Sequence, residues 1–121
     1  MNCNQAIEYI HSLEKFGIKP GLERIKALCE VLGNPQNSLK FIHVAGTNGK
    51  GSTSTMISNI LQKSGYNTGL FISPYVIDFR ERIQYNGNMI EKKSLANVLK
   101  RLRKLSIIFP KTEFSRLSLR L

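Results

Sequence analysis

Residues 46–52 read Gly46-Thr47-Asn48-Gly49-Lys50-Gly51-Ser52, and this stretch decides the fold. An apolar run over residues 39–45 precedes it, and a helical pattern over residues 52–63 follows it. A strand that feeds a glycine-rich turn and then a helix builds an anion site, because the N–H groups of the turn and of the first helical residues converge at the positive end of the helix dipole. Lys50 adds a mobile positive charge suited to phosphate oxygens. The stretch therefore predicts a phosphate-binding loop for a nucleoside triphosphate.

The strict loop motif G-x-x-x-x-G-K-[ST] does not match, since Val44 occupies the first glycine position and Gly51 follows the lysine directly. The tighter form G-T-N-G-K-G-S resembles the signature of the folylpolyglutamate synthase and dihydrofolate synthase family, within the Mur-type ligases. Further segments similar to that family follow in the same order, at residues 20–25, 32–35, 73–75, 81–83 and 111–114.

The resemblance implies an α/β fold with a P-loop-type parallel βαβ core and N-terminal helices, as in a truncated Mur-ligase-like ATP-binding domain. We expect a partial N-terminal ATP-binding domain over residues 1–114. Residues 115–121 depart from the family pattern, and we expect a non-family tail there. A frameshift or truncation of an ancestral ligase is our hypothesis for that tail, and a short paralogue with its own ending is the alternative.

Hydrophobic periodicity supports the same architecture. Strands are predicted at 39–45 and 66–73 with a helix between them, and this spacing favours a right-handed parallel βαβ unit. Because ligands bind at the carboxyl ends of such strands, Lys50 and Ser73 are expected at one edge of the sheet. Further predictions are helices near 5–16, 22–32 and 92–108, an Asn-Gly hairpin over 83–90, burial of Met56, Ile57, Ile60 and Leu61, and a packed core position for His43.

The family resemblance implies an ATP-dependent amide ligase. ATP would phosphorylate a carboxylate of a folate or dihydropteroate substrate, and the amino group of L-glutamate would attack the acyl phosphate. Lys50 would be the catalytic cation and would pair with the β and γ phosphates. The ATP-binding residues would be Thr47, Asn48, Gly49, Lys50, Gly51 and Ser52, where the glycines let the backbone approach phosphate closely.

The same resemblance assigns magnesium and substrate residues. Ser73 would help to hold Mg²⁺, and Ser52 competes for that role because it carries the first hydroxyl after the lysine. Ile18, Lys19 and Pro20 match the segment that borders the pterin, although an ordinary helix–helix loop explains them equally well. Arg82 would meet an anion in a loop over 75–82, or would be an ordinary exposed arginine.

Length, composition and charge limit the kinds of protein that this sequence can encode. The 121 residues suffice for one small domain, and they contain neither a signal peptide nor a long apolar run. Two unpaired cysteines are typical of a reducing compartment, so a cytoplasmic location is expected. Residues 91–121 carry nine Lys or Arg and two Glu, within a net charge of +10. We favour a solvated helix face over nucleic-acid binding there, because no aromatic residues interleave with the charges.

Three other functions stay open on the sequence. The first alternative is a non-catalytic nucleotide-binding module that acts with a complementary partner chain. The second is a fragment of a muramyl-peptide ligase, and the third is a basic nucleic-acid binder. Gly51 directly after the lysine favours the folate branch over the muramyl branch. On the main hypothesis the isolated chain is inactive and prone to aggregation, because the family's remaining metal ligands and its glutamate-binding domain are missing from these residues.

Overall fold

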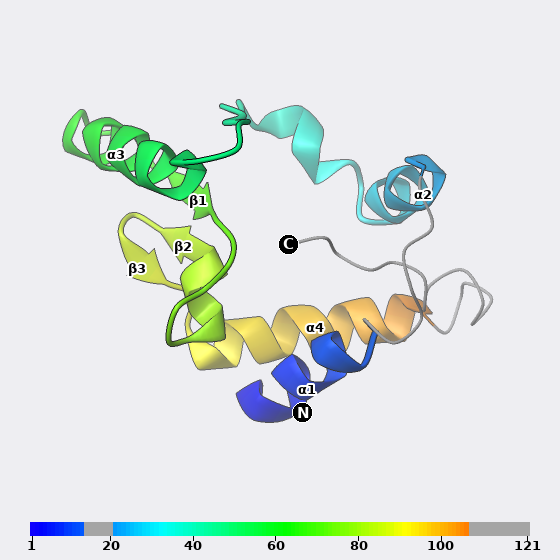
Figure 1. The fold of residues 1–121 in the computed structure, drawn as a ribbon. Coiled ribbons are helices and arrows are strands. Elements are labelled where there is room, and N and C mark those ends of the chain that lie inside the picture. Colours follow the sequence, from blue (N-terminus) through cyan, green and yellow to red (C-terminus); the bar gives the residue numbers. More distant parts are fainter. Residues whose placement is uncertain (14–20, 107–121) are drawn as a thin grey trace. The chain divides into compact units, whose positions relative to one another are not determined.

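The computed structural model describes residues 1–13 and 21–106. The elements follow in the order α1 (Cys3–Leu13), α2 (Glu23–Val31), a 3-10 helix (Pro35–Ser38), α3 (Lys50–Lys63), β1 (Gly69–Phe71), a 3-10 helix (Phe79–Arg82), β2 (Ile83–Tyr85), β3 (Asn88–Met89) and α4 (Lys92–Ser106) (Figure 1). The α/β class is confirmed. None of these helices is long and apolar enough to cross a membrane.

The chain divides into two compact units. One unit is Ile42–Leu95, and the other contains the described residues before and after it. In the latter unit α1 lies along α4 (Figure 1), and the guanidinium carbon of Arg103 lies 5.7 Å from the ring centroid of Tyr9. Ala6, Ala96 and Leu99 are buried there. The amphipathic pattern of the last predicted helix therefore marks a packed face, although Ile107 and Ile108 lie outside the described residues.

The unit Ile42–Leu95 contains a three-stranded sheet in the order β1-β2-β3. Both pairs are antiparallel, with Leu70 opposite Gln84 and Tyr85 opposite Asn88. The predicted hairpin is confirmed, because Asn86 and Gly87 both have positive φ (46° and 81°), as a two-residue turn between twisted strands requires. Helix α3 packs against β1.

The predicted parallel strand pair is wrong for the described residues. Residues 39–45 have no strand assignment, and the strand inside the predicted 66–73 run pairs antiparallel with β2. A strand forms only where a neighbour exchanges hydrogen bonds with it, and no described segment does so with 39–45. The hairpin strand β2, by contrast, is close to β1 in sequence, so local antiparallel pairing forms instead.

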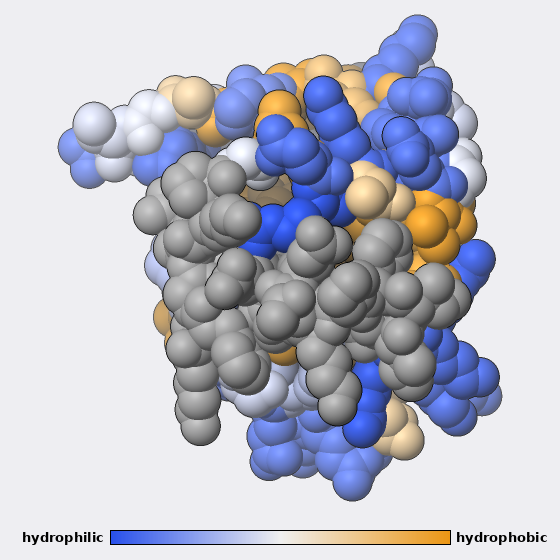
Figure 2. Space-filling view, turned by 90° about the vertical axis from the view of Figure 1, so that its right-hand side faces the viewer, coloured by the Kyte–Doolittle hydropathy of each residue, from blue (hydrophilic) through white to orange (hydrophobic). Residues whose placement is uncertain are grey.

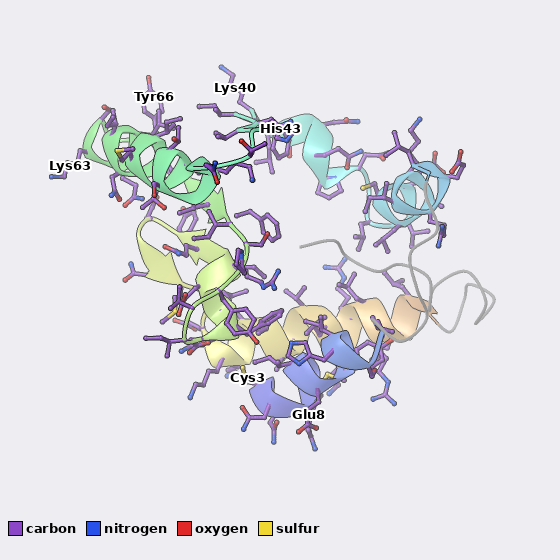
Figure 3. All side chains as sticks on the ribbon, in the orientation of Figure 1. Cys3, Glu8, Lys40, His43, Lys63 and Tyr66 are labelled. Carbon is purple, nitrogen blue, oxygen red and sulfur yellow. The ribbon has the colours of Figure 1, made fainter. Side chains whose placement is uncertain are left out.

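The predicted burial is also corrected. His43 was expected in the core but is exposed, and Figure 3 shows it with Lys40 on the segment that leads to α3. In α3 the buried residue is Ser58, whose Oγ accepts a hydrogen bond of 3.0 Å from Gln62 Nε2. Met56 and Ile60, predicted to be buried, are exposed. Apolar groups on the surface stand out in orange among hydrophilic residues in Figure 2.

Candidate functional site

The turn before α3 presents unpaired backbone donors. Gly49 is the N-cap of α3 with φ 76°, a left-handed conformation that favours glycine, and Lys50 is the first helical residue. The hydrogen bond from Thr53 N–H to Gly49 O, 3.0 Å long, begins the helical ladder. The N–H groups of residues 49–52 precede that bond, and among the described residues they have no backbone partner. The predicted loop–helix junction is therefore present.

The charge at this junction is positive. The Nζ of Lys50 donates a hydrogen bond of 2.7 Å to Gly46 O, so the lysine folds back over the turn that precedes it. The first turn of α3 contains no acidic residue. The ammonium group and the positive end of the helix dipole therefore act together, with no carboxylate in that turn to neutralise them.

The glycines at the junction face open space. A Cβ on Gly49 or on Gly51 would meet no heavy atom within 4 Å. The backbone of Gly51 is not in the left-handed region, so neither its conformation nor a neighbouring described atom demands glycine there. A glycine near the start of a helix weakens it by about 0.5–1 kcal/mol relative to alanine. A ligand that closely approaches the backbone at position 51 would account for the glycine there.

Some polar side chains around the start of α3 form hydrogen bonds within the protein, and others do not. Ser54 Oγ donates to Lys50 O and Thr55 Oγ1 donates to Gly51 O, each at 2.8 Å. Ser52 is exposed, and its hydroxyl makes no hydrogen bond within the described ranges. The same holds for the side chains of Thr47 and Asn48. The hydroxyl and amide groups predicted to bind ATP are therefore accessible to a ligand.

Ser73 lies two residues beyond the end of β1 and is exposed. Its hydroxyl has no hydrogen-bond partner in the described part of the chain. Two parallel strands would bring Ser73 and Lys50 to one edge of a sheet, but residues 39–45 form no strand, so this predicted juxtaposition has no basis in the described sheet. Both residues nevertheless belong to the unit Ile42–Leu95, in which α3 packs on β1. The described residues contain no group of three His, Cys, Asp or Glu that could hold a metal ion.

Glu81 and Asp78, which were not among the predicted site residues, shape the loop after Ser73. The carboxylate of Glu81 accepts three backbone hydrogen bonds, from the N–H groups of Val76, Ile77 and Asp78, at 2.8, 2.9 and 2.7 Å. Asp78 in turn accepts from Arg80 N–H at 2.9 Å and so completes a capping box. The pattern Asp-x-x-Glu at 78–81 was a visible signal for this arrangement.

The hydrogen bonds around this loop lower two pKa values. The backbone N–H groups of Asp78, Val76 and Ile77 hold the pKa of Glu81 below its ordinary value, because they stabilise the charged form. The Arg80 side chain lowers the pKa of Asp78 through a salt bridge of 2.7 Å. Both carboxylates are therefore engaged as anions that order the loop.

Arg82 packs against two aromatic rings of the same loop, which also contact each other. Its guanidinium carbon lies 5.2 Å from the ring centroid of Tyr75 and 5.4 Å from that of Phe79. The two rings meet edge to face at 5.7 Å. Its Nε is buried and has no hydrogen-bond partner within residues 1–13 and 21–106. The expectation of an exposed arginine is therefore wrong, since this side chain is half-buried and packed.

The expected substrate-binding residues Ile18, Lys19 and Pro20 lie outside the described residues. Their role stays a prediction.

Comparison with known proteins identifies relatives of the chain. No protein-family model matches it. The dihydrofolate synthase/folylpolyglutamate synthase of Bacillus subtilis is 50% identical over 98 residues, which are 78% of this chain and 23% of that protein. The chain thus spans about a quarter of the length of this relative.

Solved structures agree with the sequence match. The folylpolyglutamate synthetase from Lactobacillus casei superimposes with a TM-score of 0.76 and 37% identity over 97% of this chain and 31% of its own. A folylpolyglutamate synthase complex with AMPPCP and folate gives a TM-score of 0.74 and 34% identity over 97% of this chain and 30% of its own. By sequence and by fold, the chain corresponds to the N-terminal portion of a member of the folylpolyglutamate synthase and dihydrofolate synthase family.

Proposed function

We propose that the chain supplies the ATP-phosphate-binding part of a ligase that joins L-glutamate to folate or dihydropteroate. The observation that carries this proposal is the open start of α3, where Lys50 follows a left-handed Gly49 and the N–H groups of residues 49–52 have no backbone partner among the described residues. The solved relative with bound AMPPCP and folate supports the choice of ATP and of a folate-type substrate.

The proposed chemistry at this junction is positioning and charge neutralisation. The N–H groups of residues 49–52 would bind phosphate oxygens, and Lys50 would leave Gly46 O to pair with the β and γ phosphates. Thr47, Asn48 and Ser52 would add side-chain donors. Bound ATP would supply the phosphoryl group that activates the substrate carboxylate.

Magnesium would reach the site with the nucleotide. Ser73 offers one neutral oxygen and Ser52 another, and Mg²⁺ is usually bound by a few protein ligands together with phosphate oxygens and water. This donor set fits a nucleotide-bound ion, since the described residues contain no cluster of carboxylates and histidines that would hold the ion alone. The role of Ser73 as the Mg²⁺ ligand is part of the proposal.

Complete catalysis requires more polypeptide than these 121 residues. The chain spans 23% of the B. subtilis relative, so the glutamate site is expected in sequence that the chain does not match. We propose a cytoplasmic enzyme in which this portion acts with the rest. The second candidate is a non-catalytic nucleotide-binding module that works with a partner chain, and the same partial coverage favours it.

Glutamate-dependent release of ADP tests the function. The chain would be assayed alone and together with a polypeptide that carries the unmatched remainder of the B. subtilis relative, with folate and dihydropteroate as alternative substrates. We expect release only from the mixture, and only when substrate and glutamate are both present. Release by the chain alone would contradict the proposed division, and no release from an assembled mixture would favour the non-catalytic module.

A further inference from the structure

The sequence contains two Asn-Gly pairs, Asn48-Gly49 before α3 and Asn86-Gly87 in the hairpin, and both lie in the unit Ile42–Leu95. Asparagine is a thermally labile residue, because the backbone nitrogen of the next residue can attack its carboxamide carbon. A following glycine leaves that nitrogen unshielded, since glycine has no Cβ. The two pairs are chemically alike, so only their surroundings in the fold distinguish them.

The carboxamide of Asn86 is held at both of its polar atoms. Its Oδ1 accepts a hydrogen bond of 2.8 Å from Thr68 N–H, and its Nδ2 donates one of 3.1 Å to Asn67 Oδ1. The backbone N–H of Asn86 also donates to Thr68 O at 2.9 Å. The two side-chain hydrogen bonds oppose any rotation of the carboxamide toward the nitrogen of Gly87.

The carboxamide of Asn48 lacks this restraint. The residue is exposed, and its side chain makes no hydrogen bond within residues 1–13 and 21–106. The N–H of Gly49 has no backbone partner in the same ranges. A Cβ on Gly49 would meet no described heavy atom within 4 Å, so the backbone at this position is uncrowded.

We propose that Asn48 is a site of spontaneous deamidation, and that this reaction lowers the affinity of the loop for phosphate. The nitrogen of Gly49 loses its proton and forms a bond to Cγ of Asn48, while the bond from Cγ to Nδ2 breaks and ammonia leaves with one added proton. Water then opens the five-membered imide ring at either of its carbonyl carbons and leaves aspartate or isoaspartate at position 48. The sequence of steps consumes one water molecule and involves no change of oxidation state.

The product places a carboxylate in a loop whose charge is positive. The ammonium group of Lys50 and the positive end of the α3 dipole lie at this junction. The effect on affinity rests on the proposed function: the new carboxylate neutralises this charge and repels phosphate oxygens. Isoaspartate also adds one carbon atom to the main chain, which shifts the N–H groups that follow it.

The N–H of Gly49 has two roles that exclude each other. In the proposed phosphate site it donates a hydrogen bond to a phosphate oxygen, whereas deamidation requires the same nitrogen to lose its proton and attack Asn48. Bound nucleotide therefore protects Asn48, and the loop without nucleotide undergoes the reaction.

The first test omits nucleotide, so that its outcome does not depend on the phosphate site. The full chain would be incubated in mildly alkaline buffer made with water labelled with heavy oxygen, and peptide mass spectrometry would follow both Asn-Gly pairs. We expect position 48 to deamidate at least about tenfold faster than position 86 and to incorporate the label, because Asn86 first has to lose two hydrogen bonds. A rate at position 48 that does not exceed the rate at position 86 would overturn the inference.

Matched variants test the cause of this difference. Asn67→Ala removes one partner of the Asn86 carboxamide, so the rate at position 86 should rise about two- to tenfold while the rate at position 48 stays the same. Asn48→Gln should remove the fast reaction, because the longer side chain would have to close a six-membered ring. Fast release of ammonia that persists in Asn48→Gln would overturn the inference.

The second test measures the link to nucleotide. AMPPCP with Mg²⁺, at about ten times its dissociation constant, should slow the reaction at position 48 about tenfold and leave position 86 unchanged. The deamidated chain, separated by ion exchange, should bind AMPPCP at least about tenfold more weakly than the fresh chain. Asn48→Asp should share this loss and keep its melting temperature, since an acidic group is favourable near the start of a helix.

Two outcomes separate the inference from the proposed function. Unchanged affinity for AMPPCP after complete deamidation at position 48 would overturn the inference. Failure of the fresh chain to bind AMPPCP would overturn the proposed function alone, because the comparison of positions 48 and 86 uses no nucleotide.

Discussion

The ammonium group of Lys50 lies 2.7 Å from the carbonyl oxygen of Gly46 and donates a hydrogen bond to it. This bond joins the two ends of the glycine turn, and both residues are exposed. A phosphate carries full negative charge and binds an ammonium group more strongly than a neutral carbonyl does. Lys50 is therefore poised to exchange its internal acceptor for a ligand.

Replacement of Lys50 by alanine should weaken the binding of nucleotide without lowering the stability of the fold. Hydrogen bonds to charged groups contribute about 1.5–3 kcal/mol, so Lys50→Ala should weaken binding of AMPPCP by roughly 10- to 100-fold. The melting temperature should change little, because the bond to Gly46 is exposed. Isothermal titration and thermal unfolding measure the two effects. Lys63→Ala, at the other end of α3, is the control and should bind normally.

Gly51→Ala should raise the melting temperature of the chain and lower its affinity for AMPPCP. A Cβ at Gly51 meets no described heavy atom within 4 Å, and alanine strengthens a helix by about 0.5–1 kcal/mol over glycine. The same methyl group would stand where phosphate oxygens approach the backbone. Thermal unfolding and titration with AMPPCP test both effects in one protein.

The opposite outcome is expected at Gly49. Its φ of 76° strains any residue with a Cβ, so Gly49→Ala should destabilise the chain by about 1 kcal/mol or more.

For the Gly51→Ala variant, an unchanged affinity for AMPPCP would show that no ligand approaches the backbone at position 51.

Ser73→Ala should affect only the magnesium-dependent part of nucleotide binding. With one neutral hydroxyl lost, we expect a decrease of about tenfold or less when Mg²⁺ is present, and no change when EDTA removes it. Ser52→Ala is the competing variant. If Ser52→Ala abolishes the magnesium dependence and Ser73→Ala does not, the ligand assignment belongs to Ser52.

The loop held by Glu81 should loosen in acid. The lowered pKa of Glu81 means that its charged form is stabilised in the fold, so this contribution is present above the ordinary value of 4.5 and is lost as the pH falls through the lower folded value. NMR shifts of the Val76 and Ile77 amides should follow this titration. Glu81→Gln should remove the pH dependence, whereas Glu91→Gln should retain it.

Local rules predicted the helices and the hairpin well. Gly33 and Gly65 follow the C-caps of α2 and α3 with φ of 81° and 89°, the left-handed conformation with which glycine commonly ends a helix. Asn86 and Gly87 form the predicted turn. The loop–helix junction at Lys50 was equally visible, because it depends only on neighbouring residues.

Tertiary context explains the errors. The apolar run 39–45 would form a strand only if neighbouring strands supplied hydrogen-bond partners on its edges. The sequence of the run does not show whether such neighbours exist. The burial predicted for Met56 and Ile60 fails for the same reason, since a helix face is buried only when something covers it. The three-donor contact of Glu81 was missed because the loop lacks periodicity, although its capping-box spacing was legible.

The most direct test of the phosphate-binding proposal is a nitrogen–proton NMR titration of the chain with AMPPCP and Mg²⁺. We predict that the largest amide shifts occur at residues 49–52, whose N–H groups have no backbone partner among the described residues, and that Lys50→Ala suppresses them. Shifts that are largest on the basic residues of α4, or that persist unchanged in Lys50→Ala, would contradict the proposal.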